Sequence, residues 1–528
     1  MSNRPAPVPL PAPHPDWKAP AGEGGILIWP EPPKLMADIF QNHRELKTSQ
    51  ALVQNVPLAE LRHRARQALT TRNDALIIAS GHQTELYHAG VWAKDALASA
   101  VTARMANDGG QAWHFCVDTD QPKHLVLHWP GGAGPITDDP GMSSAAWSGL
   151  IRNPSWMHLN RLIRKIDDAS RSWRFLPEVG EVLLNLRHLL DEKFAVENLS
   201  LGESITLAME VLDETLGLTH QMRLVSPLLM TAPYLVLVHH WLARAGQLAD
   251  QYNRALADYR RAAGIRSSMR PMPDLNVEAD PAICEVPFWL DDLATGTRRR
   301  ADVSKINGEW NLCAAGGERF ALSESADGWK GAEKLAQFLS SHHLRLSPRA
   351  LTLTLYFRLL LVDQFIHGIG GARYDQVTDA LIAEHFGITP PKFCVTTATL
   401  YFPTAAGRTR VDLPRLEHEG HQLKHRSLGT EKLKMTAKIT ALPRRSSQRR
   451  AEFAQMQIRL AAATVDNPAL ADWENRLVLA KVQARAEAAL FDRELFYAFQ
   501  SRERLLGLMA DYQSRFASVN DEYKAPNQ

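Results

Sequence analysis

The residues best suited to chemistry follow a short apolar run at residues 75–80. Gly81, His82, Gln83 and His88 come directly after it. Imidazole changes charge near neutral pH, so two histidines at this spacing suit proton transfer or stabilisation of charge on a reacting group. The alternative is that they are polar loop residues with a structural role. The amphipathic pattern after them predicts a strand, a loop and a helix, and such loops form the ligand crevice of open parallel sheets.

A second polar group follows the apolar run at residues 113–117. Asp118, Asp120 and His124 stand there, and the carboxylates could hold a substrate amine, act as a base or bind a metal. An acidic cap on the next turn is the alternative. The β-α-β order places this group at the same sheet edge as His82. We assign no metal ligand, because no tight ligand spacing such as His-Glu-x-x-His is present.

A third group opens a predicted helix that runs to Phe386. It consists of His367, Gly368, Gly370, Gly371 and Arg373. Free amides and the helix dipole at such a start favour an anion, with the arginine as a clamp for phosphate or carboxylate. A tight turn would need the same glycines. The spacing fits neither the dinucleotide fingerprint nor the Walker loop, so the cofactor stays unassigned, with a nucleotide as one candidate.

The elements that must position these groups repeat the order strand, polar loop, helix and strand. This order predicts an α/β protein with a Rossmann-like parallel-sheet core in two parts, residues 34–274 and 326–405. Between them, two strand-like runs and the turn signal Asn307-Gly308 predict a small antiparallel β insertion at 275–325. Many prolines at residues 1–33 predict an extended tail.

The C-terminal quarter differs in charge and period. From 406 to 450, twelve Lys or Arg stand against four Asp or Glu. We interpret 406–446 as a basic connecting segment whose solvated face does not bind nucleic acid. Residues 447–528 predict a helical coiled-coil hairpin that could join two chains into a homodimer. Its turn is expected at Asp466-Asn467-Pro468, and its seven-residue spacing is carried by Val482, Ala489 and Phe496.

Composition bounds the class of protein. The 528 residues are 45% apolar and 22% charged with a formal charge of +2, which indicates a globular protein of several domains without a general affinity for polyanions. Four widely spaced cysteines suggest neither a disulfide framework nor a zinc ribbon. Neither a secretion signal nor a membrane span is evident. We therefore expect a cytoplasmic protein with reduced thiols.

The loop Ser80-Gly-His-Gln, the following Leu86-Tyr87 and the strand that ends in Asp118-Thr-Asp120 resemble the cysteine-adding enzymes of bacillithiol biosynthesis. In that family a Thr-Gly-Gln-Gln-type loop opens the first helix and a Glu-Asp-His-Asp-type cluster ends the next strand. Gly81 and Gln83 match the loop, and both aspartates match the cluster. The late glycine loop and the C-terminal coiled coil also correspond.

The sequence also departs from that family pattern. His82 replaces a glutamine, Glu85 and His88 replace small residues, and the acidic cluster lacks its internal histidine. The resemblance implies a core related to nucleotidylyltransferases and an activity that joins cysteine to glucosaminyl malate. Because of these departures, the residues fit equally well a divergent relative of the family that uses a different acceptor substrate.

We expect a ligase or transferase that forms a C–N bond and binds a small anionic or amino-acid substrate. Asp120 would orient or deprotonate an amine, while His82 and His88 would stabilise charge. One alternative is nucleotidyl transfer, because His88-x-Gly90 is half of the His-x-Gly-His signature. The other is a non-catalytic assembly protein that uses the coiled coil.

Overall fold

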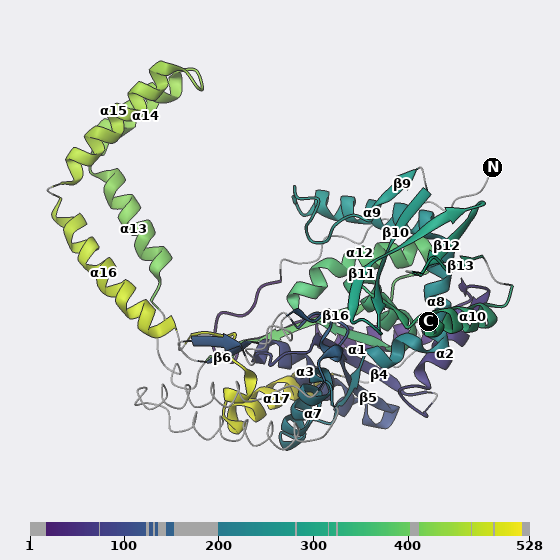
Figure 1. The fold of residues 1–528 in the computed structure, drawn as a ribbon. Coiled ribbons are helices and arrows are strands. Elements are labelled where there is room, and N and C mark those ends of the chain that lie inside the picture. Colours follow the sequence, from purple (N-terminus) through teal and green to yellow (C-terminus); the bar gives the residue numbers. More distant parts are fainter. Residues whose placement is uncertain are drawn as a thin grey trace, which may run out of the picture. The chain divides into compact units, whose positions relative to one another are not determined.

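The protein is represented by a computed structural model (Figure 1). Its description covers residues 17–72, 74–122, 126–129, 132–135, 144–152, 199–279, 282–314, 316–323, 326–401, 411–465, 467–488 and 491–519. The chain divides into a main unit and a smaller unit that contains residues 401–492.

A six-stranded sheet forms the centre of the main unit. The strand order is β1-β16-β15-β4-β5-β8, and every neighbouring pair is parallel except β1 with β16. The strands are β1 (Ile26–Trp29), β4 (Leu76–Gln83), β5 (Gly110–Val117), β8 (Gln221–Leu224), β15 (Gln364–His367) and β16 (Phe393–Ala398). The predicted α/β class with a Rossmann-like parallel core is confirmed.

The direction of winding reverses between β4 and β15. From β4 the chain passes through α3 (Ala89–Arg104) to β5, and from β15 it passes through α12 (Ile369–Phe386) to β16 on the other side. Right-handed crossovers in opposite directions place the two helices on opposite faces of the sheet. The carboxyl ends of β4 and β15 therefore form the topological switch point where open α/β sheets bind ligands.

Burial on both faces explains the continuous apolar runs of these strands. Residues 75–80 of the β4 run are all buried, as expected for a central strand of a parallel sheet. Helix α3 is also buried along nearly its whole length. Its adjacent charged residues Lys94 and Asp95 are therefore inside the protein, where each requires a partner.

The second sheet is antiparallel, with the order β13-β12-β11-β10-β14 and β9 beside β10. The predicted turn at Asn307-Gly308 joins β11 to β12, and both residues have positive φ, as in a tight hairpin turn. The sheet exceeds the predicted insertion because β14 comes from later in the chain and pairs with β10. Its strands are β9 (Val277–Ala279), β10 (Ala282–Asp292), β11 (Thr297–Ile306), β12 (Glu309–Cys313), β13 (Arg319–Leu322) and β14 (Leu344–Pro348).

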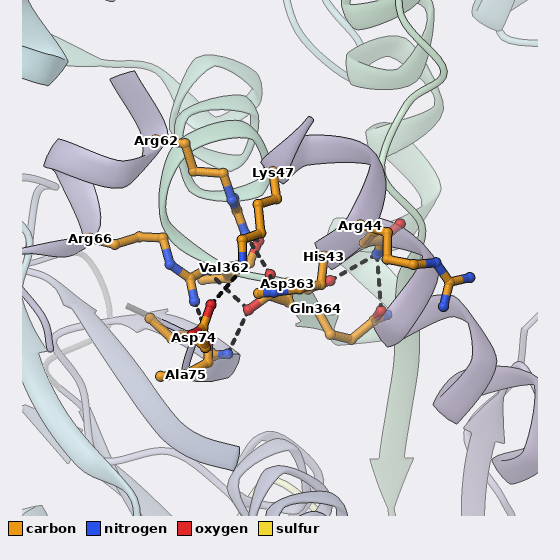
Figure 2. A network of polar contacts seen from close by, with 12 residues as sticks. His43, Arg44, Lys47, Arg62, Arg66, Asp74, Ala75, Val362, Asp363 and Gln364 are labelled. Carbon is orange, nitrogen blue, oxygen red and sulfur yellow. Dashed lines mark hydrogen bonds and ion pairs between the residues drawn. The ribbon is translucent and has the colours of Figure 1, made fainter. Parts of the chain in front are cut away.

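A buried ionic network joins the amino ends of β4 and β15 (Figure 2). Asp363 contacts Arg62 at 2.6 Å and Arg66 at 3.0 Å, and it accepts a hydrogen bond from the backbone N–H of Ile77. Burial opposes its ionisation, but the two guanidinium groups and His43 hold the pKa of this carboxyl well below its usual range. The network positions the two strands whose opposite ends form the switch point.

Further helices and short strands are described outside the two large sheets. They are α1 (Pro32–Lys47), α2 (Leu58–Arg66), α7 (Leu201–Thr215), α8 (Ala232–Ala243), α9 (Ala245–Ala262), α10 (Gly328–Ser341), α11 (Ala350–Tyr356), α17 (Arg502–Ala517), β2 (Leu52–Val53), β3 (Val56–Pro57), β6 (Val126–Trp129) and β7 (Gly132–Pro135). Short 3₁₀ turns η3 (Ser226–Met230) and η6 (Tyr497–Phe499) follow β8 and precede α17.

The predicted N-terminal tail is wrong in its second half. Residues 26–29 form β1, whose backbone pairs with β16, and α1 already begins at Pro32. Trp17 is buried and packs beside Phe393 and Val395. Proline content misled here because Pro20 precedes the strand, Pro30 follows it, and Pro32 and Pro33 stand at the start of the helix, where prolines do not interrupt hydrogen bonding. Residues 1–16 lie outside the described part of the chain.

The smaller unit is a hairpin of four helices, α13 (Leu413–Arg426), α14 (Gly429–Ala441), α15 (Ser447–Thr464) and α16 (Pro468–Ala488) (Figure 1). Helix α13 packs against α16, and α14 packs against α15. The chain therefore reverses at residues 442–446. Asn467 and Pro468 of the predicted turn lie instead at a break inside the returning arm, and Asp466 lies outside the described residues. Asn467 Nδ2 donates a 3.0 Å hydrogen bond to Ser427, where the other arm is also broken.

Two further C-terminal boundaries differ from the prediction. The basic segment supplies α13 and α14, half of the hairpin, because its apolar side chains recur at helical spacing among the charges. The last part of the chain leaves the hairpin, and α17 packs on α3 in the main unit. Phe496, placed in the predicted coiled-coil seam, is fully buried in that unit, whereas the side chain of Val482 and residue Ala489 lie outside the described part.

Candidate functional site

His82 stands at the carboxyl end of β4, beside the switch point. Its Nδ1 lies 2.9 Å from Glu85 Oε1, and both side chains are partly exposed. Burial lowers the pKa of His82 below its usual value, while the hydrogen bond to Glu85 raises it in part. The ring is therefore neutral near pH 7, with Nδ1 bound to the carboxylate. This arrangement leaves Nε2 as the nitrogen that can accept a proton.

His88 caps the start of α3. Its Nδ1 accepts a 3.0 Å hydrogen bond from the backbone N–H of Gly90, and its Nε2 lies 3.4 Å from Glu494 Oε2. Burial lowers the pKa of His88 from its ordinary value. The lone pair on Nδ1 accepts the hydrogen bond that caps α3. These contacts favour a structural role for His88 over a role as a base. The sequence indicated that His88 lies in the loop before the helix, but it did not indicate that the ring caps the helix.

Lys94 lies on α3, six residues after His88. Its Nζ donates a 2.6 Å hydrogen bond to the carbonyl of Gly81, and burial lowers its pKa to about 8. A buried amine with a lowered pKa is characteristic of functional lysines. Sequence reasoning missed this residue, although a Lys-Asp pair inside an otherwise apolar helix signals two buried charges.

A buried polar network lies beneath the His82 loop. Asp95 accepts hydrogen bonds from Ser80 Oγ at 2.5 Å and Tyr87 OH at 3.3 Å, and its Oδ1 lies 2.9 Å from His114 Nδ1. Burial opposes ionisation of Asp95, yet the nearby cations hold its pKa well below the usual range. The ring of Tyr87 stacks on His114 at 5.8 Å and lies 5.6 Å from His82. The network thereby connects the sheet to the loop that carries His82.

The two predicted aspartates have different roles. Asp118 Oδ1 accepts from the backbone N–H groups of Val225 and Ser226 at 3.1 and 2.9 Å, and Ser226 Oγ donates to Oδ2. Burial raises the pKa of Asp118, and the side chain is almost inaccessible. These contacts contradict a catalytic role and match the acidic cap, because both oxygens are occupied by the turn after β8.

Asp120 faces the polar edge of the sheet. It accepts a hydrogen bond from Gln83 Nε2 and another from the backbone N–H of Gln121 at 2.9 Å. Gln83 and Asp120 are thus brought together as the sequence predicted, at the ends of β4 and β5. His124, predicted beside them, lies outside the described part of the chain.

The late glycine loop begins at the end of β15. His367 is buried, and its Nε2 lies 2.9 Å from Asp375 Oδ2, so the ring faces the protein interior. A Cβ at Gly371 would come within 2.9 Å of His367 Nδ1, which explains that glycine. Gly368 and Gly370 have open space where a Cβ would lie, and none of the side chains that the structure describes caps the first turn of α12. Amides at this start are therefore accessible to an anion.

Arg373, the predicted anion clamp, contacts the N-terminal segment of the chain. Its Nη2 donates a 3.0 Å hydrogen bond to the backbone carbonyl of Trp17, so it anchors the N-terminal segment beside α12. The sequence could not reveal this contact, because the partner is a main-chain group more than three hundred residues away.

The two loops share one edge of the sheet. In the parallel pair, Phe365 aligns with Ala79, so His367 extends to the level of Gly81. A Cβ at Gly81 would lie 3.6 Å from the ring of Phe365 and 3.1 Å from the carbonyl oxygen of Phe115. The register therefore places the loops after β4 and β15 at the same carboxyl edge of the sheet, a relation that the sequence left open. Close packing on both sides accounts for glycine at position 81.

Two cavities lie at the other end of the sheet. One of about 400 Å³ is lined by residues around Gly387 and Pro391, before β16. The other, of about 370 Å³, borders the Asp363 network and is lined by Arg62, Arg66 and Asp74 among others. Both lie among residues that precede strands, so neither coincides with the site at the carboxyl ends.

Comparisons with known proteins leave the family unassigned. No family model matches the chain, and no curated protein matches it. A solved structure from Campylobacter jejuni, provisionally named as an arginyl-tRNA synthetase, aligns over 87% of this chain and 98% of its own. The identity is 11% and the TM-score 0.19. Among the described residues, no helix is long and apolar enough to cross a membrane.

Proposed function

We propose that the chain is an enzyme of the ligase or transferase class that joins an amine-bearing substrate to a small anionic acceptor. The observation that carries the proposal is the His82–Glu85 pair at the topological switch point of a parallel α/β sheet. A carboxylate that holds one nitrogen of a neutral imidazole leaves the other nitrogen as a positioned base. Open sheets of this kind bind their ligands at the same place.

Each neighbouring group has a role in this proposal. The amine attacks a carboxyl carbon of the other substrate, so that a C–N bond forms, a C–O bond breaks and one oxygen leaves as water. His82 Nε2 takes the proton that the amine loses, and Asp120 accepts a hydrogen bond from the same amine. Lys94 holds the Gly81 carbonyl and adds positive charge close to His82. The accessible amides of Gly368 and Gly370 bind the anionic group of the acceptor. Together these groups supply orientation and electrostatic stabilisation.

The finer proposal is the addition of cysteine to a glucosaminyl-malate acceptor, as the resemblance in the first loop implies. Gly81, Gln83 and Asp120 support it, because they match the family pattern and lie together at the sheet edge. Asp118 matches the pattern as well, but its contacts suit a structural role. His82 and Glu85 are specific to this chain and leave room for a different acceptor.

Mass spectrometry of the reaction mixture tests this activity. The full-length protein is incubated with cysteine and glucosaminyl malate, with and without ATP and Mg²⁺, beside an established cysteine-adding enzyme. We expect a product with the summed mass of both substrates less one water. Failure to form it, while the established enzyme does, contradicts the assignment to cysteine addition.

Nucleotidyl transfer is the second candidate, supported by the uncapped first turn of α12. It predicts that a nucleoside triphosphate with Mg²⁺ raises the melting temperature. A ligand at one hundred times its dissociation constant adds about 2.7 kcal/mol to stability. Absence of a shift with every common triphosphate counts against it.

A further inference from the structure

A buried group of acidic and imidazole side chains lies between α3, α7 and the start of β8. Asp95 comes from α3, Asp213 from α7, and His220 immediately precedes β8. One ligand atom of each lies within 4.8 Å of the others, and all three residues are buried. Because they belong to three separate elements, no spacing in the sequence could have revealed the group.

The surrounding hydrogen bonds hold the two carboxylates in place. Asp213 Oδ1 accepts 2.8 Å hydrogen bonds from Trp92 Nε1 and Tyr497 OH. Asp95 is held by Ser80 and Tyr87, as described above. The carboxylates are therefore positioned by side chains that do not come from the group itself, which is the usual support of metal ligands.

Several atoms of the group still have unused bonding capacity. Within the described residues, Asp213 Oδ2 and both ring nitrogens of His220 have no hydrogen-bond partner. His220 Nε2 lies 3.2 Å from Asp213 Oδ2, but the two are not aligned for a hydrogen bond. The side chains are 1% and 2% exposed, so water at the surface does not satisfy them. Buried polar atoms without partners are costly and point to an additional binding partner.

Charge leads to the same conclusion. Two buried carboxylates require nearby positive charge, since isolated anions are strongly disfavoured in the interior. His114 Nδ1 already lies 2.9 Å from Asp95 Oδ1, whereas Asp213 Oδ2 has no hydrogen-bond partner among the described residues. A divalent cation would supply two charges and use the free lone pairs.

We propose that Asp95, Asp213 and His220 bind one divalent transition-metal ion. Two oxygens and one imidazole nitrogen suit Zn²⁺ or Mn²⁺ better than Ca²⁺ or Mg²⁺, which prefer ligand sets made of oxygen alone. Bonds to Zn²⁺ measure about 2.0–2.2 Å, so binding draws the three side chains together. The ion links α3 and α7 to the sheet under the His82 loop. The proposal does not depend on the proposed enzymatic function.

Metal analysis of the full-length protein provides the test. The protein is stripped with a chelator, dialysed against Zn²⁺ or Mn²⁺ and desalted, and its metal content and melting temperature are measured. We expect one bound ion per chain and a higher melting temperature with Zn²⁺ or Mn²⁺ than with Mg²⁺ or Ca²⁺. Substoichiometric retention of both transition metals, with an unchanged melting temperature, overturns the proposal.

Variants locate the ion. Asp213→Asn and His220→Gln should lower the affinity at least about tenfold. His239→Gln is the matched control, because His239 is also a buried histidine with two unpartnered nitrogens but is not a member of the ligand group. Equal binding by His220→Gln and His239→Gln contradicts the assignment.

If a variant fails to fold, the absorption spectrum of the wild-type protein with bound Co²⁺ still tests whether the site exists. Bands in the visible region characteristic of mixed nitrogen and oxygen ligands, removed by one equivalent of Zn²⁺, support the site. A spectrum identical to aqueous Co²⁺ overturns it.

Discussion

At the scale of single residues, the account depends on the protonation state of His82. Glu85 is the nearby acid that raises the pKa of His82 against the effect of burial. The base form is lost as pH falls through this pKa, so kcat/KM should decline on the acid side, below the usual histidine range. Replacing Glu85 removes the raising interaction.

The first prediction is that Glu85→Gln moves the acid limb of the kcat/KM profile to lower pH. His82→Gln should remove that limb and reduce kcat/KM by about 100-fold or more, the usual contribution of a general base. The profiles are measured from initial rates of product formation. An acid limb that stays in place in Glu85→Gln would show that another group controls it.

The second prediction separates the two aspartates. Asp118→Ala removes the acceptor of the Ser226 backbone N–H and one of the two acceptors of the buried Val225 N–H, whose other acceptor is the Cys116 carbonyl. It also removes the acceptor of Ser226 Oγ, so we expect a loss of about 2 kcal/mol in unfolding free energy. Asp120→Ala serves as the control and should change stability by less than about 0.5 kcal/mol. Chemical denaturation measures both. Similar stability of the two variants would argue against the capping role of Asp118.

The third prediction concerns the pH dependence of stability through His220. Interactions with Asp213 and Asp95 outweigh the effect of burial and raise the folded-state pKa of His220 to about 9, above the ordinary histidine value of about 6.5. The stabilisation is therefore fully present below pH 6.5 and is lost as pH rises through 9. With a chelator present, the free energy of unfolding should fall by about 3 kcal/mol more in the wild type than in His220→Gln over this range.

The other charged groups near His220, including Asp95, Asp213, His114 and Lys94, are present in both proteins. Denaturant melts at several pH values therefore isolate the contribution of His220. Parallel pH curves for the two proteins would contradict the raised pKa.

At the scale of elements, helix pairing in the smaller unit depends on one glycine. A Cβ at Gly420 of α13 would lie 2.0 Å from the ring of Trp473 on α16, whose Nε1 donates a 2.7 Å hydrogen bond to the Leu416 carbonyl. A large ring held in this way cannot move without separating the helices. The small residue is therefore required by packing and not by a turn.

The fourth prediction compares two alanine substitutions in helices. Gly420→Ala should destabilise the hairpin and speed its cleavage in limited proteolysis, although alanine favours helix formation. Gly507→Ala, in α17 with open space around it, should instead stabilise by up to about 1 kcal/mol. Equal protease resistance of the wild type and Gly420→Ala would contradict the packing.

Helices and strands could be predicted from the sequence where the local pattern of apolar residues reflects which side chains are buried in the fold. The runs that end in Ser80 and Val117 are apolar because both faces of a central parallel strand are covered, and they appear as β4 and β5. Partners far away in sequence were not predictable. Asp118 accepts hydrogen bonds from the turn after β8, and Arg373 donates one to the Trp17 carbonyl. Neither contact can be recognised from the residues next to Asp118 or Arg373 in the sequence. The hairpin reversal was missed because a proline at a helix start also fits a break within one arm.

At the scale of the whole molecule, exposed apolar side chains are concentrated in the smaller unit. Of the ten large apolar residues exposed in the described part of the chain, six lie in this hairpin. They are Leu433, Phe453, Ile458, Val465, Val478 and Leu479. Such concentrations mark surfaces that bind other proteins, and the expectation of a homodimer through these helices stays a prediction.

The fifth prediction is that light scattering finds a dimer that dissociates in a Leu433→Glu, Ile458→Glu double variant. Leu52→Glu, at an exposed position in the main unit, should leave the dimer intact. A monomeric wild-type protein at micromolar concentration would contradict the association.

The central claim is that the carboxyl ends of β4 and β15 form an active site in which His82 acts as a base. Single-turnover mass spectrometry with cysteine and glucosaminyl malate tests it most directly, in wild type, His82→Gln and the distant control His239→Gln. The account predicts product from the wild type and the control, and a rate lower by about 100-fold or more in His82→Gln at an unchanged melting temperature. Equal rates in all three proteins, or no product from any of them, would contradict it.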